Sequence, residues 1–159
     1  MNRFTDLAVQ ADSENIYDLV VDEDTRDFVT TDGLESSQFV SLFTDRRARA
    51  DEVADPLKRR GWIGDLVSDI PGDIIGSGLW LYEQRRLTAD VAAGVRLEAE
   101  AALQWMVPDI AKTVVAEVVR DPVARSVSLL VRTSFPTGGQ STKSYVLATA
   151  TRAGLLARL

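Results

Sequence analysis

Residues 45–78 restrict the possible folds more than any other part of this sequence. Prolines and glycines recur throughout the stretch, at positions 56, 61, 64, 71, 72, 76 and 78. No long helix or unbroken strand can run through such a pattern. The stretch nevertheless keeps many apolar side chains, from Trp62 to Ile75, which a disordered segment would lack. We therefore expect an ordered loop that packs on another surface, since irregular stretches of this length are usually functional.

The residues before this loop predict a hairpin and a helix. Residues 16–21 have the composition of a strand, and residues 27–31 are predicted to return as its partner after an acidic turn. Asp32 is the predicted N-cap of the helix, and Glu35 three residues later fits a capping box. The apolar face of this helix ends near Thr44.

The clearest helix follows the loop. Thr88 is a suitable N-cap, and the acid at Asp90 suits the positive end of the helix dipole. Apolar side chains then recur at helical spacing, at Val91, Val95, Ala99, Ala102 and Met106. Because proline stops a helix, Pro108 limits this one to about nineteen residues.

The last third of the chain predicts strands at residues 113–120, 126–133 and 143–149, separated by turns that contain proline or glycine. The fold class expected is therefore α+β, with an N-terminal hairpin, central helices and a C-terminal antiparallel sheet. A chain of 159 residues suits one domain. Residues 1–15 and 150–159 are expected to be flexible arms, although a final helix is equally compatible with the last ten residues.

The composition excludes several classes of chemistry. The chain has no cysteine and no histidine, so it can hold no thiolate nucleophile, imidazole base or serine–histidine triad. No cofactor is predicted, although oxygen ligands for Mg²⁺ or Ca²⁺ are present. No apolar run approaches the ~20 residues of a membrane span, and the N-terminus lacks a signal-peptide pattern. We expect a soluble protein made in the cytoplasm.

The charge of the chain, −6 overall, is unevenly distributed. Residues 1–36 hold ten acids and two bases, whereas residues 109–159 hold three acids and seven bases. Such asymmetry can guide ordered assembly, and an ordinary solvated surface can also produce it. The net acidity argues against a protein whose main partner is nucleic acid.

Five short runs in the middle of the chain resemble a known family in their order and spacing. They are Asp32-Gly33-Leu34-Glu35, residues 41–48, residues 59–65, residues 76–81 and Leu87-Thr88. The chain resembles the Mu-like phage family that supplies a baseplate wedge protein. That family is similar to the sheath-initiator (lysozyme-like wedge) proteins of contractile tails and of type VI secretion baseplates. The resemblance covers residues 16–135.

The resemblance implies a non-enzymatic structural part of a contractile tail baseplate, located in the virion. Such a protein would join larger wedge subunits to the first ring of the tail sheath, in six copies. Its partners would be the wedge subunits, the tail sheath protein and hub or spike proteins, with no nucleic acid and no membrane among them.

The resemblance also gives candidate wedge-binding residues. The wider family has a Gly-Glu-Arg type of loop just after the first helix, and here Asp45, Arg46 and Arg47 stand at that place without the Gly-Glu pair. Either arginine would clamp a wedge partner, with Asp45 as the nearest acid, and Arg60 and Trp62 complete the set. A solvated basic loop is the alternative. Trp62 would either anchor the interface or fill the core of its own domain.

The strands predicted at 113–120 and 126–133 are the candidates for binding the sheath, and the second of them carries the candidate residues. Val127, Leu129 and Val131 lie on one face of it, and it has neither proline nor a row of lysines to protect an open edge. A sheath strand could then add to this edge through backbone hydrogen bonds. A closed edge is the alternative.

Two other functions stay open. Glu83 with Asp69 or Asp73 would form the carboxylate pair of a cell-wall hydrolase if the distance were right. A tail-assembly adaptor or chaperone would bind its client only transiently. The run Gly76-Ser77-Gly78 lacks the Gly-Lys-Ser/Thr ending of a phosphate loop, so we interpret it as a tight turn.

Overall fold

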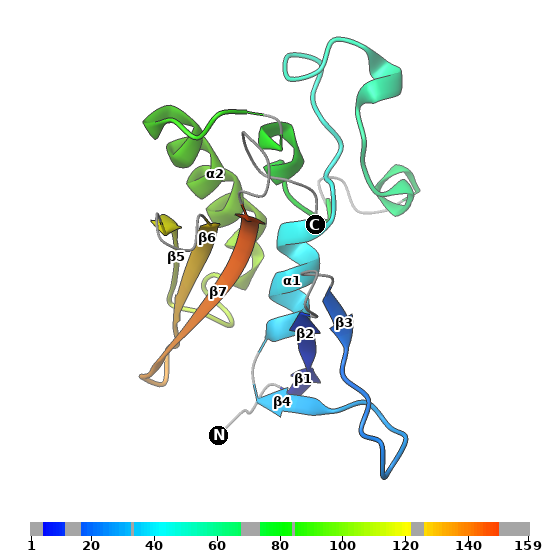
Figure 1. Cartoon of the computed structure of the whole chain (residues 1–159), viewed down its shortest axis with the longest axis vertical. Helices are drawn as coiled ribbons and strands as arrows, with labels where there is room; N and C mark the ends of the chain where they lie inside the picture. Colours follow the sequence, from blue (N-terminus) through cyan, green and yellow to red (C-terminus); the bar gives the residue numbers. More distant parts are fainter. Residues whose placement is uncertain are drawn as a thin grey trace.

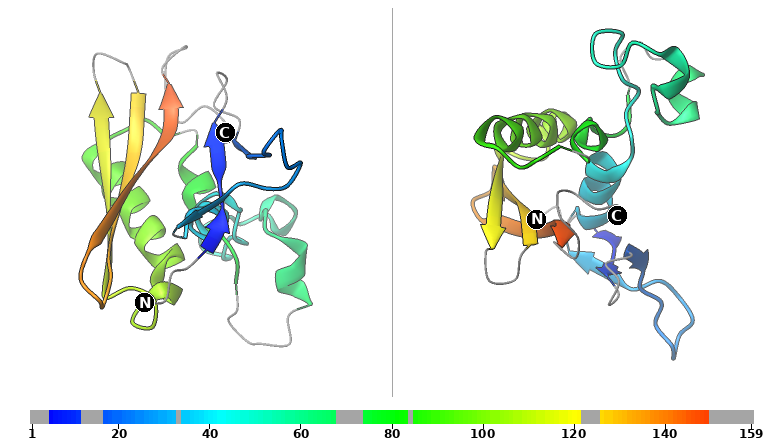
Figure 2. Two further views of the ribbon diagram at one scale, coloured as in Figure 1. Left: turned by 90° about the horizontal axis from the view of Figure 1, so that it is seen from below. Right: turned by 45° about the horizontal axis from the view of Figure 1, so that its top comes forward.

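A computed structural model describes residues 5–11, 17–32, 34–67, 74–83, 85–121 and 126–149 of this chain. The larger part is an antiparallel sheet of three strands in the order β5-β6-β7. These strands are β5 (Thr113–Asp121), β6 (Ser126–Ser134) and β7 (Gln140–Thr149). Helix α2 (Ala89–Ala102) covers one face of the sheet, and α1 (Glu35–Phe43) lies on the β7 side (Figures 1 and 2). The predicted α+β class and C-terminal antiparallel sheet are confirmed.

The core lies between the sheet and the two helices. Its buried residues are Leu42, Val95, Ala99, Leu103, Met106, Ala111, Ala116, Leu129, Val131, Tyr145 and Leu147. The three strands form where strands were predicted, and the alternation predicted in β6 turns Leu129 and Val131 to the core, because every second side chain of a strand lies on the same face. A buried polar group joins the helix layer to the sheet: Gln38 Nε2 donates to Thr133 Oγ1 at 3.1 Å, and Tyr145 Oη donates to Gln38 Oε1 at 3.2 Å.

Helix α2 begins as predicted and ends earlier than predicted. Thr88 Oγ1 accepts the Val91 amide at 3.3 Å, which confirms the N-cap. The helix stops at Ala102. The amide of the next residue, the buried Leu103, donates to the carbonyl oxygens of Ala99 and Ala101. A short 3₁₀ turn, η4 (Gln104–Met106), follows it. The predicted nineteen-residue helix is therefore wrong, because the chain tightens before Pro108 is reached.

The N-terminal residues form a small ribbon that the sequence did not reveal. Strands β1 (Thr5–Leu7) and β2 (Val9–Ala11) follow one another along the chain. They pair antiparallel with β4 (Thr30–Asp32) and β3 (Tyr17–Leu19), respectively. The segments predicted as the two strands of a hairpin therefore pair mainly with residues 5–11, part of the expected flexible arm. Residues 150–159 lie outside the described part of the chain.

The predicted N-cap of α1 is wrong. Asp32 belongs to β4, and Leu34 occupies the cap position without a side-chain hydrogen bond. Asp6 of β1 caps the helix instead, because its Oδ2 accepts the Ser37 amide at 3.1 Å and its Oδ1 accepts the Ser36 hydroxyl. Burial alone would raise the pKa of Asp6, but these hydrogen bonds outweigh it and hold the pKa below its ordinary value. A carboxylate at a helix N-terminus also complements the helix dipole.

Candidate partner-binding loop

The chain leaves the body of the protein at the end of α1 and returns next to the same point. Residues 45–67 extend away from the rest of the molecule and contain the 3₁₀ turns η1 (Pro56–Lys58) and η2 (Ile63–Leu66) (Figures 1 and 2). A parallel bridge between Asp45 and Ser77 joins the outgoing and returning segments. The prediction of an ordered loop is confirmed for the described residues.

Gly76 lets the two segments approach this closely. Its φ is +101°, and a Cβ on Gly76 would lie 2.2 Å from the Thr44 carbonyl oxygen. The next residue, Ser77, is buried, donates its hydroxyl to the Leu42 carbonyl and donates its amide to the Thr44 carbonyl at 2.9 Å. Residues 76–78, interpreted as a tight turn, instead bend the chain on either side of the bridge between Ser77 and Asp45.

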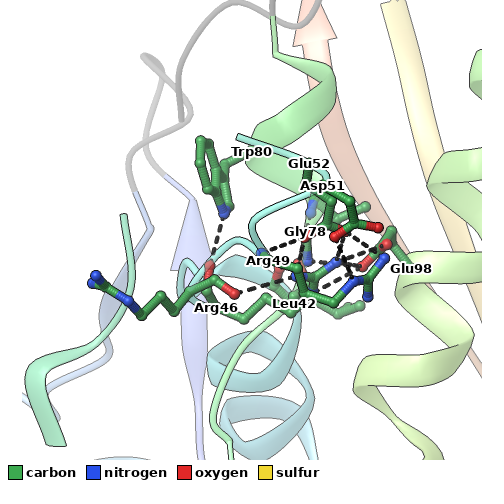
Figure 3. Close-up of polar contacts among 11 residues, drawn as sticks. Leu42, Arg46, Arg49, Asp51, Glu52, Gly78, Trp80 and Glu98 are labelled. Atoms are coloured by element: carbon green, nitrogen blue, oxygen red, sulfur yellow. Dashed lines mark hydrogen bonds and ion pairs between the residues drawn. The ribbon is translucent and has the colours of Figure 1, made fainter. Parts of the chain in front are cut away.

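Arg46 fastens the base of this loop to α2 (Figure 3). Its guanidinium bonds both carboxylate oxygens of Glu52, at 2.7 and 2.9 Å, and both of Glu98 on α2, at 3.0 and 3.1 Å. The Arg46 side chain is only 14% exposed. Its carbonyl accepts the Trp80 indole N–H at 2.9 Å. Arg46, predicted as a wedge-binding residue, thus points into the protein and holds the loop in place.

The two acids that bind Arg46 were missed from the sequence. Glu98 lies seven residues after Val91 and three after Val95, so it shares the apolar face of α2. An acid on such a face needs a partner, because burying an unpaired charge is costly. The position of Glu98 on the apolar face could therefore have predicted an ion pair there. Glu52 gave no such signal, because it lies in the irregular loop.

The ion pair makes the stability of the protein sensitive to acid. Hydrogen bonds from Arg46 lower the pKa of Glu52 from its ordinary 4.5 to about 2, and burial opposes them only in part. A carboxylate with a lowered pKa in the folded state stabilises the fold fully above its unfolded pKa. This contribution is lost as the pH falls from 4.5 toward about 2.

We expect the melting temperature of the protein to exceed that of Glu52→Gln most at about pH 6. The difference should shrink steadily as the pH falls below 4.5, because Glu52 takes up a proton in the unfolded chain while it stays ionised in the folded protein. Thermal unfolding followed by circular dichroism across this range measures it. A difference that stays constant with pH would contradict this assignment.

The other polar candidates lie around the base of the loop, closer to its surface. Arg60 Nη1 contacts Asp45 Oδ2 at 3.3 Å and Glu83 Oε2 at 3.2 Å, and its guanidinium lies 5.0 Å from the centre of the Trp80 ring. Asp45 therefore pairs with Arg60 rather than with its arginine neighbours. Arg47 is exposed and donates only to a backbone carbonyl, at 3.3 Å.

Trp62 does not fill the core. Its side chain is 48% exposed and folds over Gly64, where a Cβ would lie 2.1 Å from the indole ring. Neighbouring apolar side chains are also exposed: Leu57 to 96%, Ile63 to 76% and Val67 to 78%. An apolar surface of this kind, rimmed by polar residues, is typical of a protein-binding site.

The loop also forms an open groove of about 520 Å³. The residues that line it are Arg47, Pro56, Leu57, Lys58, Arg59, Arg60, Gly61 and Trp80. We call it the basic groove, because none of these described lining residues is acidic.

The open edge predicted at residues 126–133 is wrong. Strand β6 is the central strand and pairs with both β5 and β7, so both of its backbone ladders are used. Leu129 and Val131 are buried in the core, and Val127 packs against it. The free edges of the sheet belong to β5 and β7. One amide on the β5 edge already has a partner in the same chain, because the Ala116 amide donates to the Glu100 carboxylate of α2 at 3.1 Å.

Within the described residues, nothing assembles a hydrolase or metal site. Glu83 pairs with Arg60, while Asp69 and Asp73 lie outside the described part of the chain. No group of three or more acidic side chains among the described residues is arranged to hold a metal ion. No helix found there is long and apolar enough to cross a membrane.

Comparison with known proteins places the chain among phage proteins. The family model described as phage protein GP46 matches residues 34–139, from the start of α1 to the turn before β7. The baseplate protein gp46 of Escherichia phage Mu is 43% identical over 86 residues, which cover 53% of this chain and 57% of that protein. The matched stretch thus spans little more than half the length of this relative. No solved structure matches the chain. The chain belongs to the phage protein GP46 family.

Proposed function

We propose that this protein is a structural component of a phage tail baseplate and acts without catalysing a reaction. The observation that carries the proposal is its 43% identity to a baseplate protein of phage Mu. The family match spans the extended loop, both helices and strands β5 and β6, so the resemblance includes the partner-binding loop and most of its support.

Within a contractile tail, the protein would join larger wedge subunits to the first sheath ring. The exposed loop supports the wedge contact, because an apolar centre with a polar rim is the usual anatomy of a protein interface. Trp62 is the proposed anchor at the centre of this contact. Arg47, Arg60 and Asp45 form its polar edge.

Arg46 has a different part in this proposal. Its ion pairs with Glu52 and Glu98 keep the loop in one arrangement before a partner arrives. Such preorganisation lowers the entropy lost on binding. The sheath contact, by addition of a strand, is assigned to the edge strands β5 and β7, because β6 has no free edge.

Co-purification tests this function. We expect the tagged chain, co-expressed with its neighbouring tail proteins, to recover a large wedge subunit and the sheath protein in a fixed ratio. Trp62→Ala should reduce recovery of the wedge subunit about tenfold or more, as loss of an aromatic anchor usually does. Trp105→Ala is the matched control, because Trp105 is equally exposed, at 49% against 48%, but lies in η4, outside the loop.

Recovery of the chain alone would contradict the structural role. Equal losses for Trp62→Ala and Trp105→Ala would contradict the assignment of the wedge contact to the loop.

A further inference from the structure

A narrow hairpin of strongly negative charge projects from the N-terminal ribbon. Residues 20–29, which we call the acidic hairpin, extend away from the body (Figure 1, below β3). The hairpin contains one base, Arg26, and four acids, Asp22, Glu23, Asp24 and Asp27. Glu23, Asp24 and Asp27 are exposed to solvent.

The acidic hairpin has a fixed shape. The Asp22 carboxylate accepts the amides of Asp24 and Thr25 at 2.9 and 2.8 Å, and the Asp22 amide donates to the Asp27 carbonyl at 2.9 Å. These bonds also hold the pKa of Asp22 below its ordinary value, so the turn stays charged near neutral pH. The acids are therefore presented by an ordered turn rather than by a loose chain.

Two apolar side chains accompany the acids. Val21 and Phe28 face one another across the hairpin in an antiparallel bridge, and directly opposed residues lie on the same face of such a ribbon. They remain 52% and 49% exposed. The acidic hairpin thus combines negative charge with an exposed apolar pair, which suits a partner surface that is both basic and apolar.

The basic groove at the other end of the molecule has this character. Arg47 and Arg59 supply its positive charge together with the exposed Lys58, which lies 3.8 Å from Asp55. Arg60 is balanced by Asp45 and Glu83. Leu57, almost fully exposed, forms part of its apolar wall. Its volume of about 520 Å³ is within the range of protein pockets that take a ligand.

We propose that the acidic hairpin of one copy docks into the basic groove of a second copy of this chain. Charge complementarity orients the pair, and burial of Val21 and Phe28 against Leu57 adds the apolar contact. The hairpin and the loop that forms the groove project from opposite ends of the molecule (Figure 1 and the right view of Figure 2). The two surfaces of one copy therefore cannot meet, and the contact joins different copies.

Such a contact is head-to-tail, because the two copies use different surfaces. Repeated contacts of this kind close into a ring or continue as a helical filament. The inference goes beyond the proposed wedge contact, which is centred on Trp62. Arg47, packed against Gly61, belongs both to the polar edge of the proposed wedge contact and to the lining of the basic groove. A wedge subunit and a second copy of this chain would therefore bind next to one another at Arg47.

Charge reversal on each surface tests the proposal with the isolated full chain. The hairpin variant is Glu23→Lys with Asp24→Lys, and the groove variant is Arg47→Glu with Lys58→Glu. All four residues are exposed, so both variants are expected to fold. Sedimentation equilibrium measures the association at low salt, at chain concentrations up to about 1 mM. This limit is chosen because binding sites held close together in an assembly meet at an effective concentration of about 1 mM.

We expect the unaltered chain to associate with rising concentration and to dissociate as salt screens the charges. Each variant alone should associate at least tenfold more weakly. An equimolar mixture of the two variants should regain the association of the unaltered chain, because each hairpin then meets a groove of opposite charge.

Three results would overturn the proposal: a chain that stays monomeric to about 1 mM, association that survives either reversal, or a mixture that fails to recover it. No wedge protein is present in this experiment. Its outcome is therefore independent of the baseplate function, which the co-purification tests separately.

Discussion

Arg46→Ala is expected to lower the free energy of unfolding by about 2 kcal/mol, less than the cost of breaking a fully buried ion pair, because this pair is only partly buried. The substitution removes the cation shared by the carboxylates of Glu52 and Glu98, only 14% and 20% exposed. The exposed Arg49, 2.9 Å from Glu52, then remains as the cation of Glu52. Arg46→Lys should recover only part of the loss, since an ammonium cannot bond two carboxylates in the bidentate manner of a guanidinium. Denaturation by urea, followed by circular dichroism, measures both changes.

Arg47→Ala is the matched control for this prediction. Arg47 is the next residue along the chain, but it is exposed and makes a single 3.3 Å bond to a carbonyl. Its replacement should change the free energy of unfolding by no more than about 0.5 kcal/mol. Similar losses for the two variants would show that Arg46 does not hold the loop to α2.

Gly76→Ala is expected to lower the free energy of unfolding by more than about 2 kcal/mol, from backbone strain and a steric clash together. Gly76 has a φ of +101°, and the new Cβ would lie 2.2 Å from the Thr44 carbonyl oxygen. That contact must open, and the bridge between Asp45 and Ser77 opens with it. Urea denaturation measures the loss.

Gly139→Ala separates the strain from the clash. Gly139 has a similar φ of +107°, but nothing lies within 4 Å of the Cβ position. The control should therefore lose only the cost of backbone strain, about 1 kcal/mol. If Gly76→Ala lost no more than Gly139→Ala, the close approach of the two loop segments would not matter for stability.

The features predicted correctly from the sequence are those with local signals. The N-cap at Thr88 and the three C-terminal strands depend on residues a few positions apart. The helix cap at Asp6 could not be predicted in this way, because it joins residues 30 positions apart. The strand at residues 5–11 was missed because each half, three residues long, is too short to show alternation.

The order of the strands and the role of Arg46 were also beyond the sequence. Alternating side chains show which face of a strand is buried but not which strand is central, so β6 was taken for an edge. Arg46 and Arg47 are adjacent and chemically identical, and only the position of Glu98 on α2 distinguishes them. The prediction that this loop binds a wedge partner, through Asp45, Arg47, Arg60 and Trp62, stays a prediction.

The bridge between Asp45 and Ser77 has a consequence for how this family can vary. Both ends of the extended loop are anchored at one place on the body, and residues 49–67, in the described part of its interior, contribute nothing to the core cluster. The loop therefore behaves as an insertion. Each doubling of the length of a flexible loop costs only about 0.6 kcal/mol in closure entropy. The segment after Glu52 can therefore be lengthened, shortened or exchanged in evolution, while the sheet, the helices and the ion pairs of Arg46 stay the same.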